Sequence, residues 1–420
     1  MGIKKVIDAE RLDAAMTATA DAIREKGGTA EPIPWNELTG FSDAVGAIPT
    51  GVAAAAPKDV NFYDYDGTIL YSYTVEEAAA LTELPPLPSH DGLICQGWKR
   101  TLESIRALGR GVDVGALYIT DDGRTRIYIT LRKGYTSPIL GVCPNGTVTV
   151  DWGDGTAPDV LTGTSTGEVK WTPTHEYAAE GDYVIKLTVD GTMDFNGAYT
   201  LSGAAYILRH SADGHGKNRI YLSSVRKVEI GSGVTSIGNY AFCHCTCLET
   251  VTIPDGITNI GGSICTECAS LKSLTFPDSV TTINAGGNTF ERCYSLTHFN
   301  LPDGIPNLPN YLFDQCYSLK SITIPDGVTS IGGNVFSSNY NLLSLVIPPG
   351  ITSIVSKAFF YCYGITCYDF TRHTVVPTLH NTNSFTSINK DCEIRVPAAL
   401  ADEWKAATNW ATYADYIVGV

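Results

Sequence analysis

The stretch SITIPDGVTSI, residues 321–331, contains the pattern that decides the fold of the C-terminal half of the chain. Its first part alternates polar residues with Ile322 and Ile324, which is the period of a short strand with one apolar face. Pro325 then prevents further ladder pairing, and Asp326-Gly327 turns the chain. The residues after the turn predict a second short extended piece.

The same unit recurs along the C-terminal half, and such a period is the signature of a stacked repeat. The prolines that mark the copies are separated by 23, 25, 23 and 23 residues, and they are Pro254, Pro277, Pro302, Pro325 and Pro348. Each copy also carries a Phe-x-x-Cys-x-x-Leu box or a variant, as at Phe290, Cys293 and Leu296, which we expect to close the coil with a helical turn. Because one unit cannot bury its own apolar face, stacked copies must share a core, and the sequence predicts a solenoid.

The repeat strongly resembles the BspA-like class of leucine-rich repeats of bacterial surface proteins, over roughly residues 222–370. The resemblance implies a binding protein built on a scaffold of stacked coils. In solenoids the strand face is the usual ligand surface.

The whole chain is expected to be multidomain and mainly β. The expected parts are an N-terminal helical attachment or oligomerisation segment with a linker (residues 1–57), a small α+β module (58–135), an immunoglobulin-like β-sandwich (136–200), the leucine-rich-repeat solenoid (201–370) and a helical C-terminal cap (371–420). In the module, Asp66-Gly67 predicts one hairpin, and Asp121-Asp122-Gly123 predicts a second that joins Ala116–Thr120 to Arg126–Leu131.

The expected sandwich carries a short motif, Asp151-Trp152-Gly153-Asp154-Gly155-Thr156, which is followed by His175-Glu176-Tyr177. This motif resembles the polycystic-kidney-disease (PKD) type of immunoglobulin-like domain, which implies a spacer or an adhesive module. Asp151, Asp154 and Asp159 are candidates for a calcium site. Their spacing does not fit an EF-hand loop, and turn chemistry explains the Asp-Gly pairs, so no metal is expected.

Composition and charge exclude several classes of partner. The formal net charge is −15, and a surface this acidic repels nucleic-acid phosphates and anionic lipid, so neither nucleic acid nor membrane insertion is expected. No run of about 18 apolar residues predicts a transmembrane helix. Residues 1–20 lack the apolar region of a secretory signal, so we expect the chain not to use the general secretion route.

The overall layout resembles phage and prophage tail-region proteins of anaerobic gut bacteria. The features that carry the resemblance are the N-terminal helix, the segment FYDYDG at residues 62–67, and the closing stretch over residues 402–416. The resemblance implies a tail protein of a virion, released by lysis, whose N-terminus contacts other tail proteins. A homotrimer is one candidate assembly.

Ten of the 12 cysteines lie at or after Cys243, and most of them recur in register. One column, which we expect to be a structural hydrogen-bonding ladder, consists of Cys245, Cys268, Cys293, Cys316, Asn339 and Cys362. The alternative is a zinc site that Cys243, Cys245, Cys247, Cys265, Cys268 and His244 would form. Asparagine in the column favours the ladder, and no cofactor or metal is expected.

Two sets of side chains are candidates for binding a ligand. The first is a column of tyrosines with a spacing of about 5 Å, in which each tyrosine follows the ladder position: Tyr294, Tyr317, Tyr340 and Tyr363. The second lies on the strand face, in two outward columns: Thr250, Ser273, His298 and Ser321, and Thr252, Thr275, Asn300 and Thr323. Exposed aromatic rings suit sugar rings or a protein partner, but stacking of the tyrosines on each other is the alternative. The hydroxyl-rich strand face suits a flat glycan or protein surface. The alternative is that it is a solvated β-sheet without a ligand.

The sequence contains no nucleophile elbow, phosphate loop, dinucleotide fingerprint or His-Glu-x-x-His zinc motif, so we expect no enzyme. The leading hypothesis is a non-enzymatic phage or prophage tail adhesin that recognises a glycan or protein of the host cell surface through its repeats. A bacterial cell-surface adhesin of the same repeat class is the first alternative. A tail-borne glycan hydrolase is the second alternative, and it requires that the fold bring two of the 44 acidic residues together.

Overall fold

The computed structural model describes residues 59–164, 170–195, 207–210, 222–283 and 287–420. The helical segment expected in residues 1–57 lies outside the described residues and stays a prediction. Among the residues that are described, no helix is long and apolar enough to cross a membrane.

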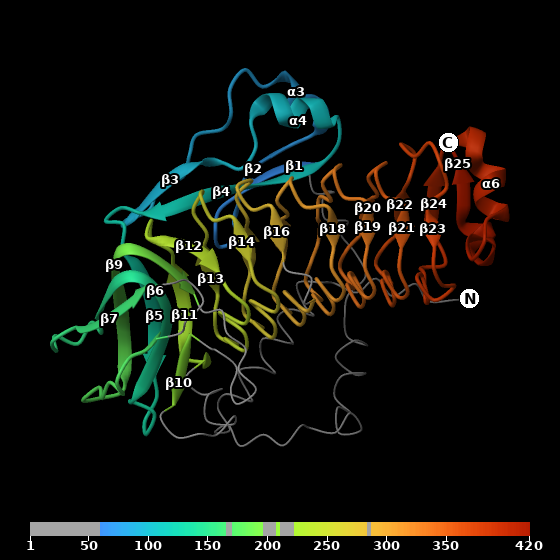
Figure 1. The fold of residues 1–420 in the computed structure, drawn as a ribbon. Helices are drawn as coiled ribbons and strands as arrows, with labels where there is room; N and C mark the ends of the chain where they lie inside the picture. The colour runs from blue at the N-terminus through green and yellow to red at the C-terminus, as the bar shows by residue number, and fades with distance from the viewer. Residues whose placement is uncertain (1–58, 165–169, 196–206, 211–221, 284–286) are drawn as a thin grey trace, which may run out of the picture. The chain divides into compact units, whose positions relative to one another are not determined.

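The α+β module is a four-stranded sheet with two short helices (Figure 1). Its strand order is β2-β1-β4-β3, and its elements are β1 (Val60–Tyr63), β2 (Ile69–Tyr73), α3 (Val75–Ala80), β3 (Leu93–Trp98), α4 (Leu102–Leu108) and β4 (Val112–Thr120). The hairpin predicted at Asp66-Gly67 is confirmed, because β1 pairs with β2 in antiparallel register and Gly67 has φ 86°. Phe62, Trp98 and Val114 belong to a core that is separate from the core of the repeats.

The second predicted hairpin, at Asp121-Asp122-Gly123, is wrong. The strand β4 pairs with β1 and β3, whereas β5 (Thr125–Leu131) pairs with β9 and β11. The physical reason is burial, since Ile127, Ile129 and Leu131 all enter the core of the next part of the chain. The turn therefore leads out of the module, whose sheet ends at Thr120 and not near residue 135.

The next part is antiparallel and is built on two long strands. Its strands after β5 are β6 (Pro138–Asp151), β7 (Asp159–Thr164), β8 (Lys170–Trp171), β9 (Gly181–Phe195) and β10 (Leu208–His210). The strand β6 pairs with each of the other four. Val148, Val150 and Trp152 are buried, as their alternation predicts. The PKD-type assignment of this part stays a prediction.

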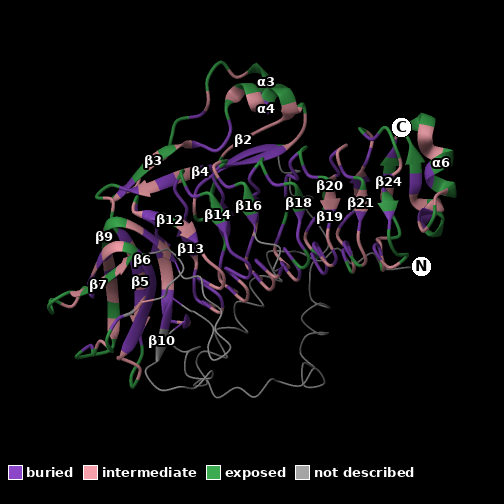
Figure 2. Cartoon of the chain, in the orientation of Figure 1, coloured by how far each residue is buried: buried purple, intermediate pink, exposed green. Residues whose placement is uncertain are grey.

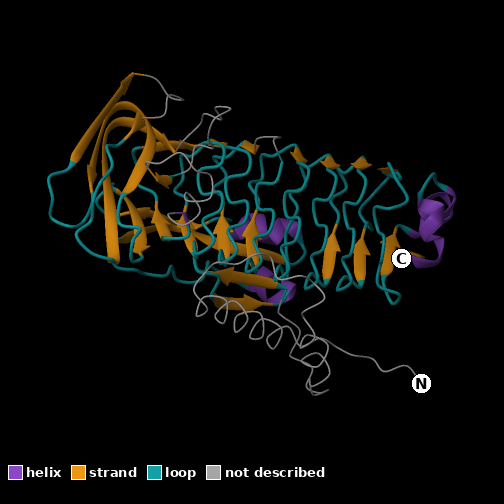
Figure 3. Ribbon diagram, turned by 90° about the horizontal axis from the view of Figure 1, so that it is seen from below, coloured by secondary structure: helices purple, strands orange, loops and turns teal. Residues whose placement is uncertain are grey.

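The repeats form coils that stack through two rows of short parallel strands (Figure 3). One row, which we call the strand face, consists of β11 (Val225–Glu229), β13 (Thr250–Thr252), β15 (Ser273–Thr275), β17 (His298–Asn300), β20 (Ser344–Val346), β22 (Cys367–Asp369), β24 (Glu393–Val396) and β25 (Ile417–Gly419). The second row consists of β12 (Val234–Ile237), β14 (Asn259–Ile260), β16 (Thr282–Ile283), β18 (Asn307–Leu308), β19 (Ser330–Ile331), β21 (Ser353–Ile354) and β23 (Thr378–Leu379). The repeat register is confirmed, because the Ser330–Ile331 strand pairs with equivalent residues of the coils before and after it.

The antiparallel part and the first coil share strands and core. The strand β5 pairs with β11, and β9 pairs with β12, so that both rows of the solenoid continue into the antiparallel sheet. One continuous cluster of buried side chains extends from Ile127 to Ile417. This part therefore covers the N-terminal end of the repeat core, which a solenoid requires.

The turn that closes each coil is not the helical turn that we expected. In the coil around Phe313, both Tyr311 and Gln315 adopt left-handed backbone conformations, with φ 59° and 61°. Alternate amides of this turn donate to the next coil, as Phe313 N does to Val335 O at 2.9 Å. A helix would direct these amides along its own axis, so the need to bond the neighbouring coil overrides it.

The C-terminal end of the core is closed by aromatic side chains on short helices. These are η2 (Ala398–Leu400), α6 (Ala401–Ala406) and η3 (Trp410–Tyr416). Trp404 and Trp410 are fully buried, and the Trp410 indole donates to Pro377 O at 2.8 Å. The strand β25 extends the strand face by one further parallel strand. The helical cap that we expected is thus present, and it is combined with added sheet.

Five members of the predicted column, Cys268, Cys293, Cys316, Asn339 and Cys362, form a hydrogen-bonding ladder. The Cys316 thiol donates to Phe290 O at 3.2 Å, and the Asn339 amide makes the equivalent bond to Phe313 O at 2.9 Å. The same bond joins Cys268 to Phe242, Cys293 to Cys265 and Cys362 to Phe336. Burial raises the pKa of the Cys362 thiol to about 12, so the group keeps its proton and can donate.

The structure gives no support to the zinc alternative. All 12 cysteines are free thiols, and the Cys268 thiol donates to a carbonyl. His244 contacts Glu267 (Nδ1–Oε2 2.9 Å). Within the described ranges, no group of three or more His, Cys, Asp or Glu side chains is placed to hold a metal ion. Burial also raises the pKa of Cys245, which disfavours the thiolate that zinc requires.

We predict that Cys316→Ala lowers the stability of the repeat region by about 1–3 kcal/mol, because it removes a hydrogen bond and leaves a small cavity. Cys316→Ser keeps a donor and should lose less. The check is the midpoint of chemical denaturation under reducing conditions. Cys367→Ala, at a half-buried position outside the ladder, is the control. A midpoint of Cys316→Ala equal to that of the control would show that the ladder does not stabilise the coils.

Candidate functional site

The strand face, where eight candidate residues were expected to point outward, is largely covered by the α+β module. The strand β4 contacts β13, β15 and β17. Ser321 is half-buried, and the other seven candidates are buried: Thr250, Ser273, His298, Thr252, Thr275, Asn300 and Thr323. The expectation of an open face is therefore wrong over these coils, because the module fills it (Figure 2). The face opens again at β20, where Ser344 is exposed.

The side chains of the covered face bond the module directly. The Ser273 hydroxyl donates to Tyr65 O at 2.6 Å, and the Ser321 hydroxyl donates to Asp113. The Asn300 amide donates to Asp113 O at 2.6 Å and accepts from Gly115 N at 3.2 Å. These small polar groups thus serve as partners for an internal protein surface. The binding of an external ligand by these residues stays a prediction.

Gly115 allows this close approach. A Cβ atom at Gly115 would lie 2.0 Å from the Thr275 hydroxyl oxygen. His298 packs nearby with its ring centroid 4.9 Å from that of Tyr63, and burial lowers its pKa. A neutral ring is therefore favoured at this contact.

A second set of contacts runs along the Pro-Asp turns of the repeats. Lys99, whose side chain is fully buried, lies 3.2 Å from Asp278 and also donates to Leu301 O. Arg100 makes two hydrogen bonds to Asp303, at 2.9 and 2.7 Å, and Arg110 lies 3.4 Å from Asp326. We call this series the turn-aspartate column. One basic residue of the module meets the aspartate of each of three consecutive coils.

The sequence reasoning missed the turn-aspartate column, because turn chemistry already explained each Asp. The signal that was available is the spacing: aspartates repeat at Asp278, Asp303 and Asp326, and the module carries Lys99-Arg100 and Arg110. The aspartates recur at the repeat period, and the module carries a cluster of basic residues in an otherwise acidic chain. Together these two features predict that the module docks on the aspartates.

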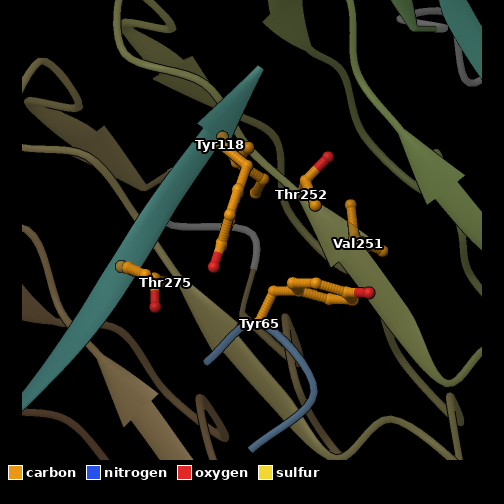
Figure 4. A pocket seen from close by; sticks show the side chains of 7 residues that line it. Tyr65, Tyr118, Val251, Thr252 and Thr275 are labelled. Atoms are coloured by element: carbon orange, nitrogen blue, oxygen red, sulfur yellow. The ribbon is translucent and has the colours of Figure 1, made fainter. Parts of the chain in front are cut away.

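A small cavity of about 10 Å³ lies between the module and the repeats (Figure 4). Tyr65 and Tyr118 contribute from the module, and Val251, Thr252 and Thr275 contribute from the strand face. This volume admits no more than about one water molecule. The cavity therefore does not offer a site for a small-molecule substrate.

The tyrosine column has the geometry that the repeat spacing predicts. Ring centroids are 4.9 Å apart for Tyr294 and Tyr317, 5.0 Å for Tyr317 and Tyr340, and 5.9 Å for Tyr340 and Tyr363. The interplanar angles of these pairs are 18°, 16° and 23°, so the rings stack on each other. Tyr363 is 51% exposed and Tyr340 is 37% exposed, so the column reaches the surface at its C-terminal end.

A column of polar side chains lies beside the tyrosines. It occupies the second left-handed position of each turn, and its members are His244, Glu267, Arg292, Gln315, Ser338, Tyr361 and Ser387. The Arg292 guanidinium donates to Glu267 at 2.8 Å, and the Tyr317 hydroxyl donates to Gln315 Oε1 at 3.0 Å. We call this series the polar column. It includes Tyr361, whose ring lies 5.6 Å from that of Tyr363.

The Asp-Trp-Gly-Asp motif forms a structural cluster around a buried indole. Trp152 stacks on His175 at 4.5 Å and donates to Asp159 at 2.9 Å. Asp154 accepts from Thr156 N at 3.1 Å and lies 2.8 Å from His175 Nε2. Asp151 accepts from Gly153 N at 2.9 Å. Asp151 and Asp154 thus bond backbone amides two residues further along, as turn chemistry predicts, whereas Asp159 bonds the indole.

The sequence of the repeats matches a known family. Residues 215–287 and 285–390 match the family model described as a BspA type leucine rich repeat region, in six copies. This part of the chain is a BspA-type leucine-rich repeat region. The match extends past residue 370, where we expected the BspA-type repeats to end. No curated protein matches the chain at a significant level.

Several solved structures are similar to the chain. A leucine rich repeat protein of T. pallidum is 32% identical, with a TM-score of 0.26, over 28% of this chain and 54% of that protein. The chain thus spans about half the length of that protein. A leucine-rich repeat protein of Bacteroides ovatus is 18% identical (TM-score 0.28; 56% and 81% covered). A leucine rich cell surface protein of Faecalibacterium prausnitzii is 21% identical (TM-score 0.21; 43% and 76% covered).

We predict that Asp303→Asn loosens the module from the strand face, because it leaves the almost buried Arg100 guanidinium without its anion. Opening can be followed by the labelling rate of Ser273→Cys, a fully buried position, after Cys95 and Cys367 are replaced by serine. We expect at least a tenfold faster rate, which corresponds to about 1.4 kcal/mol.

Asp255→Asn is the matched control for this experiment. Asp255 occupies the same turn position, but the module contacts it through Gln96, which accepts from the Asp255 backbone amide at 3.0 Å. Equal labelling rates for the two asparagine variants would mean that the ion pair does not hold the module.

Proposed function

We propose that this chain is a non-enzymatic adhesin that recognises a glycan or protein of a host cell surface through its BspA-type repeats. The observation that carries the proposal is the exposed, ordered pair of Tyr340 and Tyr363 on the coils that the module leaves uncovered. Tyrosine combines a large apolar ring with a polar tip, and it is enriched where proteins bind partners.

The organisation of the coils supports a binding role over a catalytic one. The cavity at the junction of module and repeats has no room for a substrate. The acidic residues that face the module, Asp278, Asp303 and Asp326, are occupied by basic side chains. This use of the carboxylates gives no support to the glycan hydrolase hypothesis, which needs a free pair across a substrate cleft.

We assign the adhesin to the tail of a phage or prophage, with residues 1–57 as the segment that attaches it to other tail proteins. The support is the overall layout described above, and residues 58–420 form a compact unit that does not include residues 1–57. A bacterial cell-surface adhesin is the second candidate. It is favoured by the BspA-type repeat region, a class known from bacterial surface proteins.

We predict that the double variant Tyr340→Asn, Tyr363→Asn binds bacterial cells at least tenfold more weakly than the unmodified chain, a loss of about 1.4 kcal/mol or more. The measurement is the binding of fluorescently labelled full chain to the strain that encodes it and to related strains. Tyr311→Asn is the control, since Tyr311 is 40% exposed but lies outside the tyrosine column.

The same cells can be used to test whether the adhesin belongs to a phage particle or to the cell surface. After prophage induction, the chain should sediment with phage particles, as detected with an antiserum. Its recovery only from the surface of uninduced cells would favour the bacterial adhesin. If no strain binds the unmodified chain, or if Tyr311→Asn weakens binding as much as the double variant, the proposed role of the column is wrong.

A further inference from the structure

The tyrosine and polar columns together form a periodic strip, and we propose that this strip binds a linear, uncharged polysaccharide lying along the stack of coils. This inference rests on the proposed adhesin function and adds the class of the ligand. It concerns the surface around Tyr294, Tyr317, Tyr340 and Tyr363 together with Glu267, Arg292 and Gln315.

The first argument is the period of the strip. Successive tyrosine rings are 4.9, 5.0 and 5.9 Å apart, so the same phenol group returns once in each coil. The period arises from the spacing of parallel strands, which is about 4.8 Å. A sugar unit in an extended polysaccharide has a similar length. Such a polymer can therefore place an equivalent hydroxyl beside each ring, whereas a partner protein would need a stack of strands of its own to match this repeat.

The second argument is the orientation of the rings. Because neighbouring tyrosines stack, their faces are covered within the column, and the ring edges remain available. The Tyr317 hydroxyl donates to Gln315 and can still accept a hydrogen bond. An anchor in a protein interface is an aromatic side chain that inserts into a pocket of the partner, which a stacked ring does not do. Burial raises the pKa of Tyr294 and Tyr317, so each phenol stays protonated and can both donate and accept. This matches the hydroxyl groups of a sugar.

The third argument is the chemistry of the polar column. The side chains of Glu267, Arg292 and Gln315 end in planar groups that present polar atoms in pairs, which suits adjacent sugar hydroxyls. Their left-handed backbone conformations repeat with φ between 60° and 61°, so the side chains leave the backbone at the same point of each coil. Glu267 is paired with Arg292 at 2.8 Å, so the strip carries little net charge of its own.

The last argument concerns the charge of the ligand. The formal net charge of the chain is −15, and this field opposes a polyanion such as an acidic capsule. An uncharged polymer meets no such barrier. The open surface, with Tyr363 half exposed, also suits a chain that extends past several coils.

The test is competition for binding of the labelled full chain to cells. Protein-free polysaccharide from the same cells is separated into neutral and acidic fractions by anion exchange and added as competitor. We expect the neutral fraction to abolish binding, and we expect proteinase digestion of the cells to leave binding intact. Competition by the acidic fraction alone, or by neither fraction, overturns the proposal.

Variants of the polar column supply a second readout. Gln315→Ser should weaken the affinity for the neutral fraction about fivefold, the loss of one hydrogen bond. It should fold normally, because Ser338 already occupies the equivalent position with φ 61°. Asn334→Ser is the matched control, since Ser263 occupies its equivalent in the other left-handed column. Equal affinity of the two variants excludes the polar column from the site.

These outcomes separate the inference from the function on which it rests. If binding to cells is lost after proteinase digestion and still depends on Tyr340 and Tyr363, the ligand is a protein, and only the polysaccharide proposal fails. If no strain binds the chain, the adhesin function itself fails.

Discussion

Hydrogen bonding between successive coils is the constraint on which the rest of this structure depends. The two rows of parallel strands and the closing turns all bond the neighbouring coil, as Phe313 N does to Val335 O. Equivalent residues are therefore held one strand spacing apart, and every recurring residue type becomes a column. The thiol ladder, the tyrosine column and the turn-aspartate column are three products of this one register. Their chemistry differs, because each faces a different environment: core, solvent or module.

The cover over the strand face changes which of these columns can meet a partner. A solenoid normally offers its strands to a ligand, but here Ser273 and Asn300 bond the chain's own module. Gly115 lets β4 pass so closely that no side chain would fit there. The hydroxyl-rich strands are thus explained by an internal contact. On these covered coils the tyrosines at the turns, Tyr294 and Tyr317, are half-buried and still reach the surface.

Sequence reasoning succeeded where the period alone decides the outcome. It predicted the ladder of Cys316 and Asn339 and the spacing of the tyrosines, because equivalent positions must coincide in a stack. It failed for contacts between distant segments, since nothing local in Asp303 indicates that Arg100 will bind it. It also failed for the strand β5, whose alternating pattern fits a hairpin partner and a sheet neighbour equally well. A period of two shows that one face is buried, but it does not identify the strand beside it.

The end of the turn-aspartate column shows that the module and the repeats match in length as well as in charge. The coil after Asp326 carries Pro348-Pro349, so it offers no carboxylate at the turn position. Arg110 contacts the last available aspartate of the column, and Arg372 binds the same group at 2.7 and 3.0 Å. A side chain of the solenoid thus completes the pairing at the point where the basic residues of the module run out. The sequence of the repeats therefore sets the boundary between covered and open coils. Tyr340 and Tyr363, the most exposed rings of the column, lie on the coils at and beyond this boundary.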